Sequence, residues 1–403
     1  MKSFENDAHA VAPPSQRIPS IDLLRGIVMV LMALDHTRDF FSSAFFNPLD
    51  LARTTPALFF TRWITHFCAP TFVLLAGAGA YLYGARGHSN LEIARFLFIR
   101  GLLLIVFEFT LVHFGWSFNF DYHYLLAQVI WMIGWSMVIL AVLIALRVPV
   151  WALTLMGVIL IVGHNLLDSI GAHQFGSVQW LWIILHQPGT IEFGQGRQIF
   201  VLYSLVPWVG VMAVGYGLGP ILLKSPDERR KWLLRLGLGL TFALIFLRWV
   251  NVYGDPQSLI PYSDMTLQFL SFINTTKYPP SLLFLLMTLG PALIVLAFLD
   301  RANASNLLTC IFSTFGRVPL FYYVLHLSLI HTIAVVISYI RYGEASWLFG
   351  TGWMFRGGLP PEYGYELKIV YLAWIGVVII LYPICYLFAR YKEHGQAGWL
   401  RYF

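Results

Sequence analysis

The chain has 403 residues, of which 58% are apolar and only 11% are Asp, Glu, Lys or Arg. Soluble domains contain about 25% of these charged residues, so this composition and a mean hydropathy of +0.70 exclude a water-soluble protein. The net charge of +6 is typical of the excess of Lys and Arg in the cytoplasmic loops of membrane proteins, and we expect no nucleic-acid partner.

Apolar runs of about 20 residues, the length that crosses a bilayer core, recur along the chain. The first 18 residues lack the apolar stretch of a signal peptide, so the first run is the expected insertion signal. Two shorter runs, 178–185 and 307–315, predict re-entrant or interfacial helices. We predict an all-α polytopic bundle of about ten helices (10–11), with a tail at 1–18, one transmembrane domain at 19–391, a tail at 392–403, and spans near residues 21–43, 57–84, 95–116, 124–146, 149–168, 199–223, 232–250, 281–299, 318–340 and 367–390.

The basic residues predict the orientation of this bundle. If the amino terminus is cytoplasmic, the inner connections contain most of the Lys and Arg, whereas the outer loop 251–280 contains only Lys277. The positive-inside rule therefore predicts that both termini are cytoplasmic. The outer loops 251–280 and 342–366, rich in Trp, Tyr, Gly and Pro, are expected to cover a cavity that faces away from the cytoplasm.

The cysteines and small residues in the apolar runs are expected to contribute to helix packing, and no disulfide or zinc site is expected. Cys68, Cys310 and Cys385 have no CxxC spacing, which argues against disulfides and zinc and favours small core residues. Gly77 and Gly79 are expected to permit close helix approach.

No metal signature is present either. His113, Asp121 and His123 have no metal-ligand spacing, and Asp121 and His123 are expected to form a solvated pair in an outer loop.

The first span combines apolar residues with ionisable ones. Arg25, Met29, Met32 and His36 recur at helical spacing and so share one face. Arg25 and His36 are about 16 Å apart along the helix axis, which approximates the reach from the phosphates of coenzyme A to its sulfur. The alternative is that Asp22 and Arg25 form an i,i+3 ion pair and that His36 is a hydrogen-bonded core residue.

Other ionisable residues lie in later spans. Arg62 and His66 are one turn apart, so either residue is a candidate for the wall of a cavity beside the first span. Glu108, deep in an apolar run, needs a partner. His326 and His331 point about 140° apart on a helix, which predicts that one faces the cavity and the other a neighbouring helix.

The sequence resembles bacterial members of the heparan-α-glucosaminide N-acetyltransferase family, within the wider group of transmembrane acyltransferases. The resemblance rests on RIPSIDLLRGIVMVLMALDHTRDFF, HFCAPTFVLLAGAGAYL, VLYSLVPWVGVMAVGYGLG and FGRVPLFYYVLHLSLIH, which together span residues 17–331. The wider group has an arginine, ten intervening residues and a histidine in its first helix, and Arg25 and His36 have that spacing. Region 53–67 has no clear counterpart of the histidine that acts in the lysosomal enzyme, so His36 is the expected base.

The resemblance implies transfer of an acyl group, with acetyl-CoA as co-substrate, from the cytoplasm to an acceptor on the far side of a bacterial inner membrane. We therefore predict an acyl-CoA-dependent O- or N-acyltransferase without a metal. Its expected partners are membrane lipids, acyl-CoA and a sugar or glycan acceptor, and association with further copies is left open.

His36 is the expected base, acting directly or through an acyl-histidine. Asp35 or Asp39 is expected to orient its ring, and Arg38 or Arg62 to stabilise the oxyanion. The expected site comprises the catalytic residues His36, Asp35 and Asp39, the donor-binding residues Arg25 and Asp22, and the substrate-contacting or supporting residues Arg38, Arg62, His66, Glu108 and His326.

A transporter or flippase for an anionic or amphiphilic solute is the alternative. Arg25, Glu108 and the histidines would then serve as gates or proton relays. The absence of a visible internal repeat argues against it. A structural scaffold is the third interpretation, and it leaves Glu108 unexplained.

Overall fold

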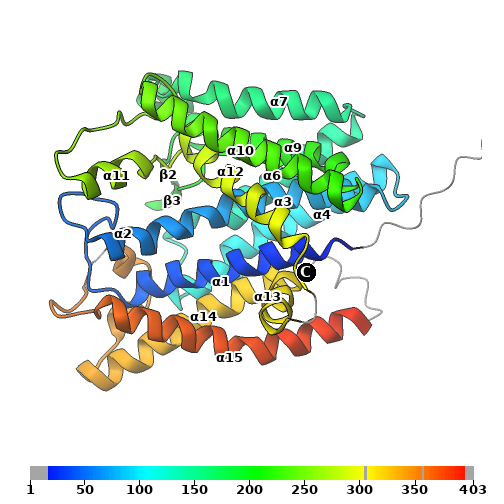
Figure 1. Ribbon diagram of the computed structural model, residues 1–403. Helices are drawn as coiled ribbons and strands as arrows, with labels where there is room; N and C mark the ends of the chain where they lie inside the picture. Colours follow the sequence, from blue (N-terminus) through cyan, green and yellow to red (C-terminus); the bar gives the residue numbers. More distant parts are fainter. Residues whose placement is uncertain (1–16, 304–305, 356–357, 395–403) are drawn as a thin grey trace, which may run out of the picture.

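The computed structural model describes residues 17–303, 306–355 and 358–394, and most of the predicted tails 1–18 and 392–403 lies outside these ranges. The described chain is a helical bundle with one small sheet (Figure 1). Its main elements are α1 (Pro19–Phe41), α2 (Pro56–Trp63), α3 (Cys68–Gly84), α4 (Asn90–Phe107), α5 (His113–Ser117), β1 (Tyr124–Ala127), α6 (Val129–Ala145), α7 (Val150–Gly163), α8 (Gln179–Leu185), β2 (Gly189–Phe193), β3 (Arg197–Val201), α9 (Leu205–Leu222), α10 (Pro226–Val250), α11 (Met265–Ile273), α12 (Leu282–Leu299), α13 (Leu307–Arg317), α14 (Pro319–Tyr342) and α15 (Leu367–His394).

The predicted spans correspond to helices of the structure. Among the described residues, eight helical segments are long and apolar enough to cross a membrane. The other two predicted spans are α6, which has 17 residues, and α1, which has 23 residues but includes the charged cluster that begins at Asp22 and ends at Asp39. The two short apolar runs form the short helices α8 and α13. The protein is therefore an all-α polytopic membrane protein.

Helix α1 lies in the middle of the bundle, between α3 on one side and α13, α14 and α15 on the other (Figure 1). It begins with Pro19, whose fixed φ suits the first helical position, and it has Asp22 in its first turn and Arg38 in its last. Both charges are favourable for the helix dipole. Because α1 is surrounded, most of its residues are buried, Asp22, His36 and Arg38 among them.

Glycines bring several helix pairs into backbone contact. A Cβ on Gly77 of α3 would lie 2.0 Å from the carbonyl oxygen of Met212 in α9, so the predicted close approach is confirmed there. Gly79 differs, because nothing lies within 4 Å of its added Cβ. The tightest crossing joins α1 and α13, where a Cβ on Gly26 would lie 1.7 Å from the Phe312 carbonyl oxygen and one on Gly316 would lie 1.8 Å from that of Asp22.

A three-stranded sheet corrects two of the predicted helices. The strand order is β1-β3-β2, with β1 parallel and β2 antiparallel to β3. Residues 124–127 and 199–201, predicted as helix starts, are strands, and α6 and α9 begin only at Val129 and Leu205. Short apolar runs fit a buried strand as well as a helix turn, so periodicity alone does not separate them.

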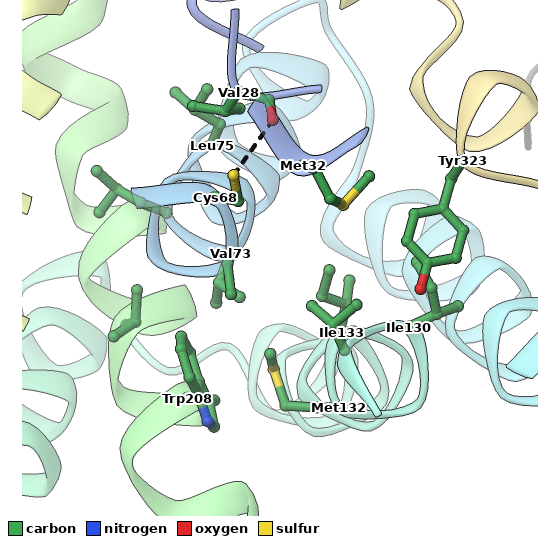
Figure 2. Packing of buried hydrophobic residues seen from close by; sticks show 14 of the residues in the cluster. Val28, Met32, Cys68, Val73, Leu75, Ile130, Met132, Ile133, Trp208 and Tyr323 are labelled. Atoms are coloured by element: carbon green, nitrogen blue, oxygen red, sulfur yellow. Dashed lines mark hydrogen bonds between the residues drawn. The ribbon is translucent and has the colours of Figure 1, made fainter. Parts of the chain in front are cut away.

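One predicted core residue is not buried. Cys68 and Cys385 are buried, and the thiol of Cys68 donates to the Val28 carbonyl oxygen at 3.3 Å (Figure 2). Cys310 is exposed, because α13 is a short helix that buries only the side that packs on α1. The prediction for Cys310 was therefore wrong.

Candidate active site

Two cavities lie along α1. The large cavity has a volume of about 410 Å³ and the small cavity about 230 Å³. Met32, Phe72 and Val129 belong to the walls of both, so the cavities meet halfway along α1. Figure 2 shows side chains that surround the large cavity near this junction, namely Met32, Ile130, Ile133 and Tyr323.

The predicted stripe on α1 faces these cavities. Arg25, Met29 and Met32 line the large cavity, and Met32 and His36 line the small one. The shared face inferred from helical spacing is therefore confirmed, with Arg25 in one cavity and His36 in the other.

Arginines gather where the large cavity meets the start of α1. Arg25 donates to Asp22 at 3.3 Å and to the Gly316 carbonyl oxygen at 3.3 Å, and Arg17 pairs with Asp22 at 2.5 Å. Arg86 and Arg100 complete this group in the cavity wall. The predicted Asp22–Arg25 pair forms, and four cations face one carboxylate.

The arginines of the small cavity are neutralised by carboxylates. Arg38 pairs with Asp39 at 2.5 Å and with Asp35 at 3.0 Å, and Arg62 also pairs with Asp35. All four side chains line the small cavity together with His36. The two carboxylates and the two guanidinium groups thus form one compact ion-pair network.

His36 pairs with a histidine of another helix. Its Nδ1 lies 2.7 Å from Nε2 of His326, and the two rings stack with centroids 4.9 Å apart. Asp35 and Asp39 hold arginines instead, so the partner that orients the imidazole is His326 and not the predicted aspartate.

The contact between His36 and His326 determines which ring nitrogens bear the hydrogens when both rings are neutral. His326 Nδ1 lies 2.9 Å from the Tyr322 carbonyl oxygen, which only accepts hydrogen bonds, so this nitrogen bears the hydrogen. His326 Nε2 is then an acceptor, and His36 Nδ1 must donate to it. The free lone pair of His36 is therefore on Nε2.

Of the remaining predicted site residues, Glu108 contacts the end of a neighbouring helix and His66 lies away from the cavities. Glu108 accepts a hydrogen bond from the Trp131 amide at 2.8 Å, so its partner is the amino terminus of α6, where the helix dipole favours an anion. His66 is buried against Phe284 and is not part of either cavity wall, whereas Arg62 is.

His331, Asp121 and His123 lie outside both cavity walls. The two ring nitrogens of His331 each lie 3.0 Å from a carbonyl oxygen, that of Gly115 and that of Leu348, so this ring can only donate to these neighbours. The two histidines point to different neighbours, and only His326 contacts His36. Neither of them lines either cavity, so the prediction that one of the two faces the cavity was wrong. Asp121 and His123 pair with each other in an exposed loop, as predicted.

The sequence did not single out Lys277, Tyr278 and Tyr203, which complete the small cavity. Lys277 and Tyr278 belong to loop 251–280 before α12, so this loop contributes to the cavity wall, as expected of a loop that covers a cavity. The only feature of the sequence that could have pointed to Lys277 is that it is the sole basic residue of loop 251–280. Burial raises the pKa of Tyr278, but the Lys277 and Arg62 cations outweigh it and hold that pKa below its ordinary value.

The described residues of loop 342–366 pack over the end of α1, where the Tyr363 hydroxyl donates to the Phe40 carbonyl oxygen at 2.9 Å, and they line neither cavity.

Long apolar helices that enclose two connected, charged cavities define an integral membrane protein with a site suited to polar chemistry. Residues 17–261 match the family described as heparan-α-glucosaminide N-acetyltransferase, catalytic. The chain belongs to this family of membrane acetyltransferases. The match includes Arg25 and His36, whereas Lys277 and His326 lie beyond it. No curated protein matches the chain.

Proposed function

We propose that the protein transfers an acetyl group from cytoplasmic acetyl-CoA to a hydroxyl or amine of a sugar or related acceptor on the other side of the membrane. The observation on which this proposal rests is the pair of cavities that meet at Met32, one with an arginine cluster and one with a histidine base. The family assignment supports acetyl transfer.

The large cavity suits the donor. Its wall contains Arg17, Arg25, Arg86 and Arg100, and Asp22 is the only acidic residue among the described residues that line it. Guanidinium groups bind phosphates through charge-assisted hydrogen bonds. The rest of the wall is largely apolar, which suits the pantetheine arm. The thioester of a donor bound in this way reaches the junction with the small cavity.

His36 suits the role of general base. Its Nε2 lone pair can accept the proton of the acceptor hydroxyl or amine as that group attacks the thioester carbon. Stacking on His326 and an edge contact with Trp116, with ring centroids 5.0 Å apart, hold the ring in place. Asp35 and Asp39 then serve to hold Arg38 and Arg62 in the cavity wall.

Binding of acetyl-CoA to the detergent-purified protein, measured by calorimetry, tests the donor assignment. Arg25→Ala should weaken binding about tenfold or more, because a hydrogen bond to a charged group contributes about 1.5–3 kcal/mol. His36→Ala should bind normally and lose turnover. Arg301→Ala, which removes an exposed arginine paired with Asp227, is the control and should bind like the wild type.

A wild-type protein that does not bind acetyl-CoA would contradict the proposal. The connected cavities would then favour a transporter of an anionic solute, which uptake into proteoliposomes would test.

A further inference from the structure

Lys277 is a buried cation in the small cavity. The residue is 8% exposed and lines the cavity that contains His36. Among the described residues it forms no ion pair, whereas Arg38 and Arg62 of the same wall are paired with Asp35 and Asp39. The cavity therefore has one positive charge in excess, and Lys277 is its source.

The loop that contains Lys277 is fixed in place. Asp255 accepts hydrogen bonds from the Thr276 amide at 2.9 Å, the Thr276 hydroxyl at 2.8 Å and the Ser281 hydroxyl at 2.7 Å. The Lys277 ammonium also lies 5.2 Å from the centre of the Tyr278 ring, within the range of a cation–π contact. These contacts hold the loop in place and keep Lys277 in the wall of the small cavity.

A buried ammonium without a counter-ion is unfavourable. The presence of Lys277 in the cavity therefore favours a site where a negatively charged group binds or where a negative charge forms during the reaction. Acyl transfer develops such a charge on the thioester oxygen. The charges of Arg38 and Arg62 are already balanced by Asp35 and Asp39, whereas the charge of Lys277 is paired with no carboxylate among the described residues. We infer that Lys277 stabilises this oxyanion, an inference that rests on the proposed acetyl transfer and replaces the role predicted for Arg38 or Arg62.

The acceptor oxygen or nitrogen bonds to the thioester carbon while His36 Nε2 takes its proton, and the carbonyl oxygen becomes an anion beside the Lys277 ammonium. Return of the electron pair breaks the carbon–sulfur bond, and the departing thiolate takes the proton from His36. The products are the acetylated acceptor and free CoA.

Two stable analogues of acetyl-CoA test the inference by binding alone. S-carboxymethyl-CoA places a negative carboxylate near the thioester oxygen position, whereas S-acetonyl-CoA places a neutral ketone there. Calorimetry on wild type and Lys277→Met should show that the variant loses about tenfold or more affinity for the carboxymethyl analogue. Its affinity for the acetonyl analogue should be unchanged, which also shows that the variant is folded.

Matched variants complete the experiment. Lys277→Arg should retain most of the affinity for the anionic analogue, and Lys368→Met, which removes an exposed lysine paired with Glu366, should leave both affinities unchanged. In turnover, Lys277→Met should lower kcat about 100-fold.

Equal binding of each analogue by wild type and Lys277→Met would overturn the inference while leaving the donor assignment intact. So would a loss of activity confined to acidic acceptors, for example with glucuronate but not glucose, since Lys277 would then bind the acceptor. If the wild type binds neither analogue, the proposed function itself fails.

Discussion

A single hydrogen bond, between His36 Nδ1 and His326 Nε2 at 2.7 Å, decides which nitrogen of His36 is free to act as a base. His326→Phe removes the acceptor, so the His36 ring can adopt the other tautomer or rotate. We expect kcat to fall about 100-fold and the KM for acetyl-CoA to stay within about twofold, as measured by steady-state kinetics in detergent.

The matched variant is His326→Gln, whose amide oxygen can accept the same hydrogen bond. It should recover part of the lost kcat. Equal losses in the Phe and Gln variants would show that His326 contributes only packing.

At the scale of single residues, the sequence predicted which residues of α1 line the site better than it predicted which residues they contact. Arg25 and His36 follow from spacing within one helix, and both line the cavities. The partner of His36 lies 290 residues away in α14, a pairing that only tertiary packing determines. Asp35 was a poor candidate for orienting His36, because consecutive residues on a helix point about 100° apart.

At the scale of elements, the crossing of α1 and α13 positions the donor site. Gly316→Ala would place a Cβ 1.8 Å from the Asp22 carbonyl oxygen, so α13 must move away from α1. We expect a loss of about 1–3 kcal/mol of stability, seen as a lower Tm. Acetyl-CoA binding should also weaken, because Arg25 donates to the Gly316 carbonyl oxygen.

Gly239→Ala in α10 is the control, since nothing lies within 4 Å of its added Cβ. Its stability should change by less than about 1 kcal/mol. If Gly316→Ala has the same Tm as this control, the backbone contact between α1 and α13 is not a close one in the protein.

The loop before α12 offers a second element to test. Asp255→Asn retains the side-chain size but loses the charge that accepts from Thr276 and Ser281. Hydrogen bonds to charged groups contribute about 1.5–3 kcal/mol, so the loop should loosen and kcat should fall about tenfold. The affinity for acetyl-CoA should not change. Asp264→Asn, which retains an amino-terminal cap for α11, should leave kcat unchanged.

Long apolar helices were predictable because a span needs about 20 apolar residues whatever surrounds it. The strands β1 and β3 were not, since their pairing joins Tyr124 with Gln198 and Ala127 with Val201 across a long stretch of chain. Short runs of that kind give no local signal that distinguishes a strand from the first turn of a helix.

At the scale of the whole molecule, the ends of the bundle differ in charge. The arginines of the large cavity lie at the end where α1 begins and α15 finishes, and the sheet and α11 lie toward the opposite end (Figure 1). This arrangement agrees with both predicted termini being on one side. The excess of Lys and Arg in the connections at the first end favours the cytoplasm for that side.

Labelling of single cysteines in intact cells tests this orientation. In a background without the three native cysteines, Ser225→Cys probes the exposed start of α10 and Ser258→Cys probes the exposed outer loop that follows the same helix. A membrane-impermeant thiol reagent should modify Ser258→Cys directly and Ser225→Cys only after permeabilisation. The reverse pattern would put the arginine cluster outside the cytoplasm, away from the supply of acetyl-CoA, and would remove the basis for transfer across the membrane.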